Sequence, residues 1–162
     1  MFDKRVIAWN LEQNGLNLDP SLEIKMLSEE ANEFFLATST VDRLDAVADF
    51  YYVADGTLSK MYAMPMEDLD ELSWWIEAKE MLSSYITDTK NALVNTLKME
   101  LINEYKINDD SFVEIMSQAY DIVINANEQK LCCDKDEDGK TIKPKGFIPP
   151  QDSLKKLLKK YT

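Results

Sequence analysis

Apolar residues recur along most of this chain at the spacing of amphipathic α-helices, and short polar connections separate the apolar segments. Between residues 20 and 36, for example, Leu22, Met26 and Phe34 belong to one apolar stripe. Pro20 opens this segment, and Ser21 is its expected N-cap. The pattern predicts helices over residues 3–14, 20–36, 41–56, 71–107, 109–129 and 152–162, and the third of these could also continue past Gly56. Residues 71–107 fit either one long helix or two shorter ones.

The stretch 131–150 differs from the rest of the chain because it is polar and rich in turn-forming residues. It holds three of the 5 Pro and two of the 4 Gly. We expect a loop or short hairpin that turns at Asp138-Gly139 and leads into a terminal helix. Gly and Pro are scarce elsewhere, and 162 residues suffice for one ordinary core. The sequence therefore predicts a single all-α domain over residues 1–162.

Charge and residue types narrow the possible functions. A net charge of −12 disfavours nucleic-acid binding, since phosphate backbones would be repelled. No apolar run is long enough to span a bilayer, and we expect no membrane association. The adjacent Cys132-Cys133 pair suits a reducing compartment, and the N-terminal residues lack a signal-peptide pattern, so the expected location is cytoplasmic. With 0 His in the chain, any hydrolysis must use a carboxylate, a lysine or a metal ion.

Two acidic clusters on consecutive predicted helices carry the strongest chemical signal. Glu30 and Glu33 lie on one face of the second helix, and Asp45 and Asp49 lie on one face of the third. Asp49 stands among Ala, Val, Phe and Tyr residues, where an unpaired carboxylate would cost several kcal/mol, roughly. If the two helices pack antiparallel, all four carboxylates can face one point. Hard divalent cations such as Mg²⁺ prefer that kind of site.

The alternative is a solvated acidic surface on an acidic protein. Glu29 fits that interpretation, because it can pair with Lys25 one helical turn earlier. The spacing of Glu30 and Glu33 alone would fit it as well. Asp49 favours the metal site, because two like charges on one partly desolvated turn are unfavourable without a cation.

The acidic pattern resembles the all-α nucleotide pyrophosphohydrolases known as MazG-like proteins, whose relatives include dimeric dUTPases and phosphoribosyl-ATP pyrophosphatases. The shared features are E-E-x-x-E at 29–33 and the paired acids of DAVAD at 45–49, as in short phage-type members. Their usual second motif is E-x-x-D, but Ala46 stands at its first position here. Asp45 is therefore either a metal ligand or an acid lying just outside the ligand set.

The C-terminal part extends this resemblance. Asn127-x-x-Lys130 and Lys143-Pro144-x-Gly146 look like the N-x-x-K and K-P-x-G segments that contribute to the phosphate and nucleotide pocket in that family. The resemblance thus implies phosphate contacts from Asn127, Lys130 and Lys143. Tyr52 shares the helix face of Asp49 and is expected to line the same site.

Together these features predict a Mg²⁺-dependent hydrolase, with Mn²⁺ as an alternative ion, that cleaves a nucleoside triphosphate to the monophosphate and pyrophosphate. Glu30, Glu33, Asp45 and Asp49 would hold the metal, and Glu30 or Glu33 could serve as the base. The resemblance implies a homodimer or homotetramer in a bacterial or phage-infected cell. The alternatives are an enzyme for a specialised substrate, such as a phosphoribosyl-ATP pyrophosphatase, and a non-catalytic acidic helical binding protein.

Overall fold

The described part of the structure, a computed structural model, comprises residues 4–8, 18–63, 69–131, 133–134 and 141–161. Within these ranges the chain is all-α, and no β-strand occurs among them. After a short helical segment at residues 4–8 come α2 (Pro20–Leu36), α3 (Thr40–Ala63), α4 (Leu69–Tyr105), α5 (Asp109–Glu128), α6 (Gln151–Leu158) and the 3₁₀ turn η1 (Lys159–Tyr161). The predicted all-α class is confirmed, and α4 proves to be one continuous helix.

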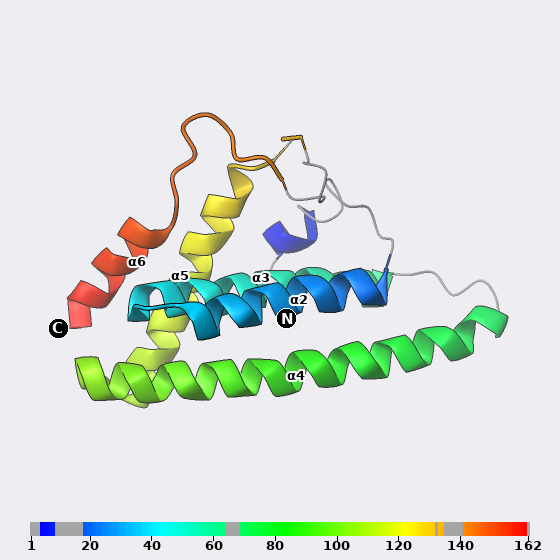
Figure 1. Cartoon of the computed structure of the whole chain (residues 1–162), viewed down its shortest axis with the longest axis horizontal. Helices are drawn as coiled ribbons and strands as arrows, with labels where there is room; N and C mark the ends of the chain where they lie inside the picture. Colours follow the sequence, from blue (N-terminus) through cyan, green and yellow to red (C-terminus); the bar gives the residue numbers. More distant parts are fainter. Residues whose placement is uncertain (1–3, 9–17, 64–68, 132, 135–140, 162) are drawn as a thin grey trace.

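The helices α2 and α3 form an antiparallel hairpin joined by residues 37–39, and they lie side by side in Figure 1. The N-cap of α2 is Asp19, whose Oδ1 accepts hydrogen bonds from the backbone N–H groups of Ser21 and Leu22. The prediction of Ser21 as the cap was wrong, because Pro20 occupies the first helical position and leaves Asp19 before the first turn. At the start of α3, Ser39 Oγ accepts from the Asp42 N–H.

Helix α3 is the centre of the molecule, because α2, α4, α5 and α6 all pack against it. It is buried around most of its circumference, and small residues such as Ala46, Ala48 and Ala54 allow the neighbouring helices to approach closely. The core is completed by large apolar residues from every neighbour, among them Phe34, Leu97, Ile115 and Leu154. An acidic residue on α3 can therefore lie partly buried between helices.

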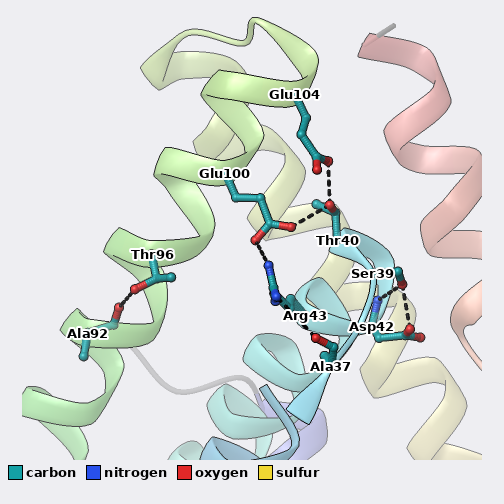
Figure 2. Close-up of polar contacts among 9 residues, drawn as sticks. All are labelled: Ala37, Ser39, Thr40, Asp42, Arg43, Ala92, Thr96, Glu100 and Glu104. Carbon is teal, nitrogen blue, oxygen red and sulfur yellow. Dashed lines mark hydrogen bonds and ion pairs between the residues drawn. The ribbon is translucent and has the colours of Figure 1, made fainter. Parts of the chain in front are cut away.

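The long helix α4 runs beside the α2–α3 hairpin, while α5 crosses the direction of that pair (Figure 1). Polar contacts fix the C-terminal part of α4 to the start of α3. Thr40 Oγ1 lies 2.6 Å from carboxylate oxygens of both Glu100 and Glu104. Arg43 forms an ion pair with Glu100 and donates to the Ala37 carbonyl (Figure 2). Arg43 is thus directed toward α4.

The C-terminal segment returns to the bundle and ends in a helix, as predicted. Ile142 N–H donates to the Asp134 carbonyl at 2.8 Å, so the two ends of the expected hairpin lie together. Its predicted turn at Asp138-Gly139 lies outside the described residues, as does Cys132. Helix α6 then buries Leu154, Leu157 and Leu158 against α3 and α5. None of the described helices combines the length and the apolar character that a membrane crossing would need.

Candidate metal and phosphate site

A cavity of about 450 Å³ opens between α2, α3, α5 and the segment 141–151. Its wall includes every residue that the sequence singled out for metal or substrate binding: Glu30, Glu33, Asp45, Asp49, Tyr52, Asn127, Lys130 and Lys143. These residues are separated by up to about a hundred positions in the chain, so the fold alone brings them together. The volume falls in the range of small-molecule sites, roughly 300–1,000 Å³.

The four predicted acids form one side of this cavity. Glu30 and Glu33 lie on α2, and Asp45 and Asp49 lie on α3. Glu30, Asp45 and Asp49 are partly buried, whereas Glu33 is exposed at the rim. The antiparallel hairpin therefore places two carboxylates from each helix around one space, as predicted from their spacing in the sequence.

Asp49 is held by a chain of hydrogen bonds that starts on α5. Asn127 Nδ2 donates to Asp49 Oδ1 at 3.2 Å, and Lys130 Nζ donates to Asn127 Oδ1 at 2.6 Å. Asn127 is itself buried, so its amide is fixed in the orientation that links the lysine to the carboxylate. The two residues of the motif Asn127-x-x-Lys130 lie about one helical turn apart. Lys130 can therefore contact the Asn127 side chain, which in turn contacts Asp49 on α3.

Asp45 has an incomplete set of partners. Gln151, the first residue of α6, donates from Nε2 to Asp45 Oδ2 at 2.6 Å. The second oxygen, Asp45 Oδ1, is buried and accepts no hydrogen bond from the residues that the structure describes. A buried carboxylate oxygen without a partner is unfavourable, roughly by 1–3 kcal/mol or more. A cation bound between the acids would supply the missing partner.

Burial and mutual repulsion raise the pKa values of three of these acids. Burial is the largest cause for Glu30, whose pKa rises to about 8 with further contributions from Asp49 and Glu33. Burial, and then the negative charge of Asp49 and Glu33, raises the pKa of Asp45 to about 7. Burial also raises the pKa of Asp49, against the lowering effects of the Asn127 hydrogen bond and of Lys130. The cluster therefore resists carrying its full negative charge.

Among the described residues that line the cavity, the cations are Lys130 and Lys143. Burial lowers the pKa of Lys130, while Asp49 raises it and the nearby Lys143 lowers it further. Two other cations close in sequence or space are committed elsewhere: Arg43 pairs with Glu100, and Lys60 pairs with the buried Glu23. The four predicted acids thus share the cavity wall with two lysines.

The donor set suits a hard divalent cation, because it consists of carboxylate oxygens from two rigid helices. In the parts of the chain that are described, no three Asp, Glu, Cys or His side chains already converge as a closed ligand cage. Glu30, Glu33, Asp45 and Asp49 are the residues that would hold such an ion. A bound cation would compensate the unpartnered Asp45 Oδ1 and the repulsion that raises the pKa values of Glu30 and Asp45.

Among the cavity residues that the sequence did not single out, Gln151 and Phe147 contact predicted site residues. Gln151 contacts Asp45, but nothing in its local pattern distinguishes it from an ordinary first-turn residue. Phe147 also lines the wall, between the expected phosphate-binding segments. The signal for Phe147 was its place in KPKGFIPP, a segment that the sequence already connected with the pocket.

Tyr52 lines the cavity as expected, and it is buried. Burial, with the charges of Asp49 and Glu128, raises the pKa of its hydroxyl. Tyr52 therefore stays neutral at physiological pH.

Comparison of this chain with family models, with curated proteins and with solved structures gave no match.

Proposed function

We propose that this protein is a Mg²⁺-dependent nucleoside triphosphate pyrophosphohydrolase, which converts a ribo- or deoxynucleoside triphosphate and water to the monophosphate and pyrophosphate. The supporting observation is the arrangement of one cavity. Glu30, Glu33, Asp45 and Asp49 from α2 and α3 line it together with Lys130 and Lys143. Acids suit divalent cations and lysines suit phosphate oxygens, so the two groups of side chains together fit a metal–polyphosphate substrate.

Glu30, Glu33, Asp45 and Asp49 are the residues that would hold Mg²⁺, or Mn²⁺ as an alternative. When bound, such ions activate water and offset the negative charge that develops on the phosphates. Asp45 fits this set best through its buried and unpartnered Oδ1. Its other oxygen is already oriented by Gln151, a common feature of carboxylates at metal sites.

Glu30 is the acid best suited to accept a proton from the attacking water. In the metal-free protein its pKa is raised to about 8 by burial and by the neighbouring carboxylates, and a bound divalent cation would lower that pKa toward the working pH. A general base works best when its pKa lies near the working pH. Glu33, at the exposed rim, is then the residue that meets the ion or the incoming substrate first.

Asn127, Lys130 and Lys143 would bind the polyphosphate. Lys130 is fixed by its hydrogen bond to Asn127, and its ammonium group points into a cavity that is partly shielded from water. Charge–charge interactions are stronger there than at an open surface. The apolar part of the wall, formed by Met26, Tyr52, Val53 and Val123, leaves a place for the sugar or base.

The same proposal includes a homodimer or homotetramer. The described part of α4 exposes large apolar side chains, with Trp74 at 47%, Ile76 at 43% and Met81 at 47% exposure. Tyr62 near the end of α3 is 63% exposed. Several such residues along one long helix suit a subunit interface. Light scattering at several protein concentrations tests this part, and a fully active monomer would contradict it.

The test of the activity is product analysis with a panel of ribo- and deoxynucleoside triphosphates, with and without Mg²⁺. We expect monophosphate and pyrophosphate, formed only with the metal. Release of orthophosphate and diphosphate instead would contradict the proposed bond cleavage. If no triphosphate is cleaved, a rise in melting temperature with Mg²⁺ would indicate a specialised substrate, and no rise would favour a non-catalytic binding protein.

A further inference from the structure

Phe147 brings together the two lysines of the cavity. Lys130 Nζ lies 5.4 Å from the centre of its ring, and Lys143 Nζ lies 5.2 Å from the same point. Both distances are within the range of cation–π interactions, about 6 Å. The lysines come from different parts of the chain, one just after α5 and one in the C-terminal segment, and the ring is their common contact.

The backbone around Phe147 is held in place from two directions. Phe147 N–H donates to the Pro144 carbonyl at 3.0 Å, closing a turn in which Gly146 has φ of 90°. A residue with a side chain adopts that φ only with strain, so glycine favours this turn. The next residue, Ile148, forms two hydrogen bonds with the side chain of Gln129. This side chain accepts from Ile148 N–H at 2.9 Å and donates to the Ile148 carbonyl at 3.2 Å.

Without the ring, Lys130 would keep its hydrogen bond to Asn127, but the two ammonium groups would lose their common contact. Each lysine has four rotatable side-chain bonds and loses freedom when it is fixed. The two positive charges also repel each other, and Lys143 lowers the pKa of Lys130. The negative face of an aromatic ring offsets both effects while adding no competing anion. A carboxylate in its place would occupy the lysines with an ion pair.

We propose that Phe147 is a positioning residue that keeps Lys130 and Lys143 at the cavity in advance of the ligand, and so preorganises a polyphosphate-binding site. This inference deepens the proposed function and rests on it only for the identity of the nucleotide. The ligand chemistry that the two lysines recognise is a chain of phosphates. Phe147 acts through the lysines and does not touch the reacting atoms.

The experiment is a calorimetric titration of the full chain with inorganic tripolyphosphate, which has no base, in the presence of Mg²⁺. The variants are Phe147→Leu, which keeps the apolar volume, and Phe147→Tyr, which keeps the aromatic ring. Ile148→Ala is the matched control, because its side chain is 68% exposed and does not line the cavity. Melting temperatures establish that each variant is folded, and Phe147→Met replaces the leucine variant if that one is unstable.

We expect Phe147→Leu to weaken tripolyphosphate binding about five- to thirtyfold, the range for the loss of two cation–π interactions at exposed sites. Phe147→Tyr should bind within about twofold of wild type, since a phenol ring retains the cation–π interaction. Ile148→Ala should bind as wild type does. With a cleavable triphosphate, Phe147→Leu should raise KM and leave kcat nearly unchanged.

Equal binding by wild type and Phe147→Leu would overturn the inference, and so would an equally large loss in Phe147→Tyr. Loss of nucleotide binding without loss of tripolyphosphate binding would assign the ring to base stacking instead. Absence of tripolyphosphate binding in the wild type would also overturn it. Failure of the proposed function is separable, because it would appear as a lack of pyrophosphate release while the tripolyphosphate results remained as expected.

Discussion

Two glutamates on α2, seven positions apart, occupy opposite electrostatic environments. Glu23 is 1% exposed, and it is neutralised from α3 by Lys60 Nζ at 2.6 Å and by the Thr57 hydroxyl at 2.6 Å. Glu30, two turns further along the same face, meets Asp49, Glu33 and Asp45. The protein supplies a counter-charge to the first carboxylate and surrounds the second with like charges. The difference separates a structural acid from one that is suited to an external cation.

The largest effect expected from this comparison is on stability at the paired site. Glu23→Gln removes the charge that compensates Lys60, which is only 4% exposed. A buried charge left without its partner costs roughly 3–5 kcal/mol. Urea denaturation should show a loss of that size. A loss below about 1 kcal/mol, the range of ordinary surface substitutions, would mean that the pair is not a structural element.

The same substitution at the second glutamate should act in the opposite sense. Glu30→Gln relieves repulsion with Asp49 and Glu33, so the metal-free protein should gain about 1 kcal/mol in stability. Pyrophosphate release should fall roughly 100-fold or more, since a metal ligand and a base are lost together. Denaturation and turnover measured on one preparation would check both. Destabilisation together with full activity would contradict the assignment.

The folding stability of the metal-free protein should depend on pH because of the acidic cluster around Glu30. An unfolded chain releases these carboxyl protons near pH 4, but the folded chain keeps them until about 7 at Asp45 and about 8 at Glu30. Between those limits the folded state binds more protons, so stability must fall as pH rises from about 4 to 8. We expect a loss on the order of 5 kcal/mol between pH 5.5 and 8.5.

Thermal denaturation across that pH range measures the loss, and Glu30→Gln should reduce it. Saturating Mg²⁺ should also make stability depend less on pH, because the bound ion would neutralise the carboxylates in place of protons. Stability that rises through the same range would contradict the repulsive cluster.

A smaller effect is expected at Gln151, which supports Asp45 from α6. Gln151→Ala leaves Asp45 without its described hydrogen-bond donor and should weaken Mg²⁺ binding about tenfold, as expected for a residue that orients a ligand. Calorimetry measures this change. The exposed neighbour Asp152→Asn serves as control and should leave the affinity unchanged. Equal affinities for Gln151→Ala and wild type would mean that the contact does not orient Asp45.

Much of this arrangement could be predicted from the sequence because it depends on short-range periodicity. The apolar stripes predicted the helices α2, α4, α5 and α6 to within a few residues, whereas α3 continues to Ala63, well beyond Gly56. The i,i+3 and i,i+4 spacings predicted that paired acids share a face. The cap of α2 was misassigned because Asp19 and Ser21 are both good capping residues, and only their backbone positions distinguish them.

The contacts that close the cavity could not be predicted in the same way. The hydrogen bond from Gln151 to Asp45 and the ring of Phe147 between two lysines join segments that are distant in sequence. Their formation depends on how α6 and the segment before it pack onto α3 and α5, which no local pattern encodes. The ion pair between Glu23 and Lys60 was missed for the same reason.

The central claim is that the acids of α2 and α3 form a cation site, and binding of Mg²⁺ or Mn²⁺ to wild type, Asp49→Asn and Asp55→Asn tests it most directly. Asp55 is a close match for Asp49, because it lies on the same helix, is partly buried and accepts a hydrogen bond from Tyr120, yet does not line the cavity. The account predicts binding in wild type and Asp55→Asn, and its loss in Asp49→Asn. No binding in the wild type, or equal binding in all three, would contradict a cation site that includes Asp49.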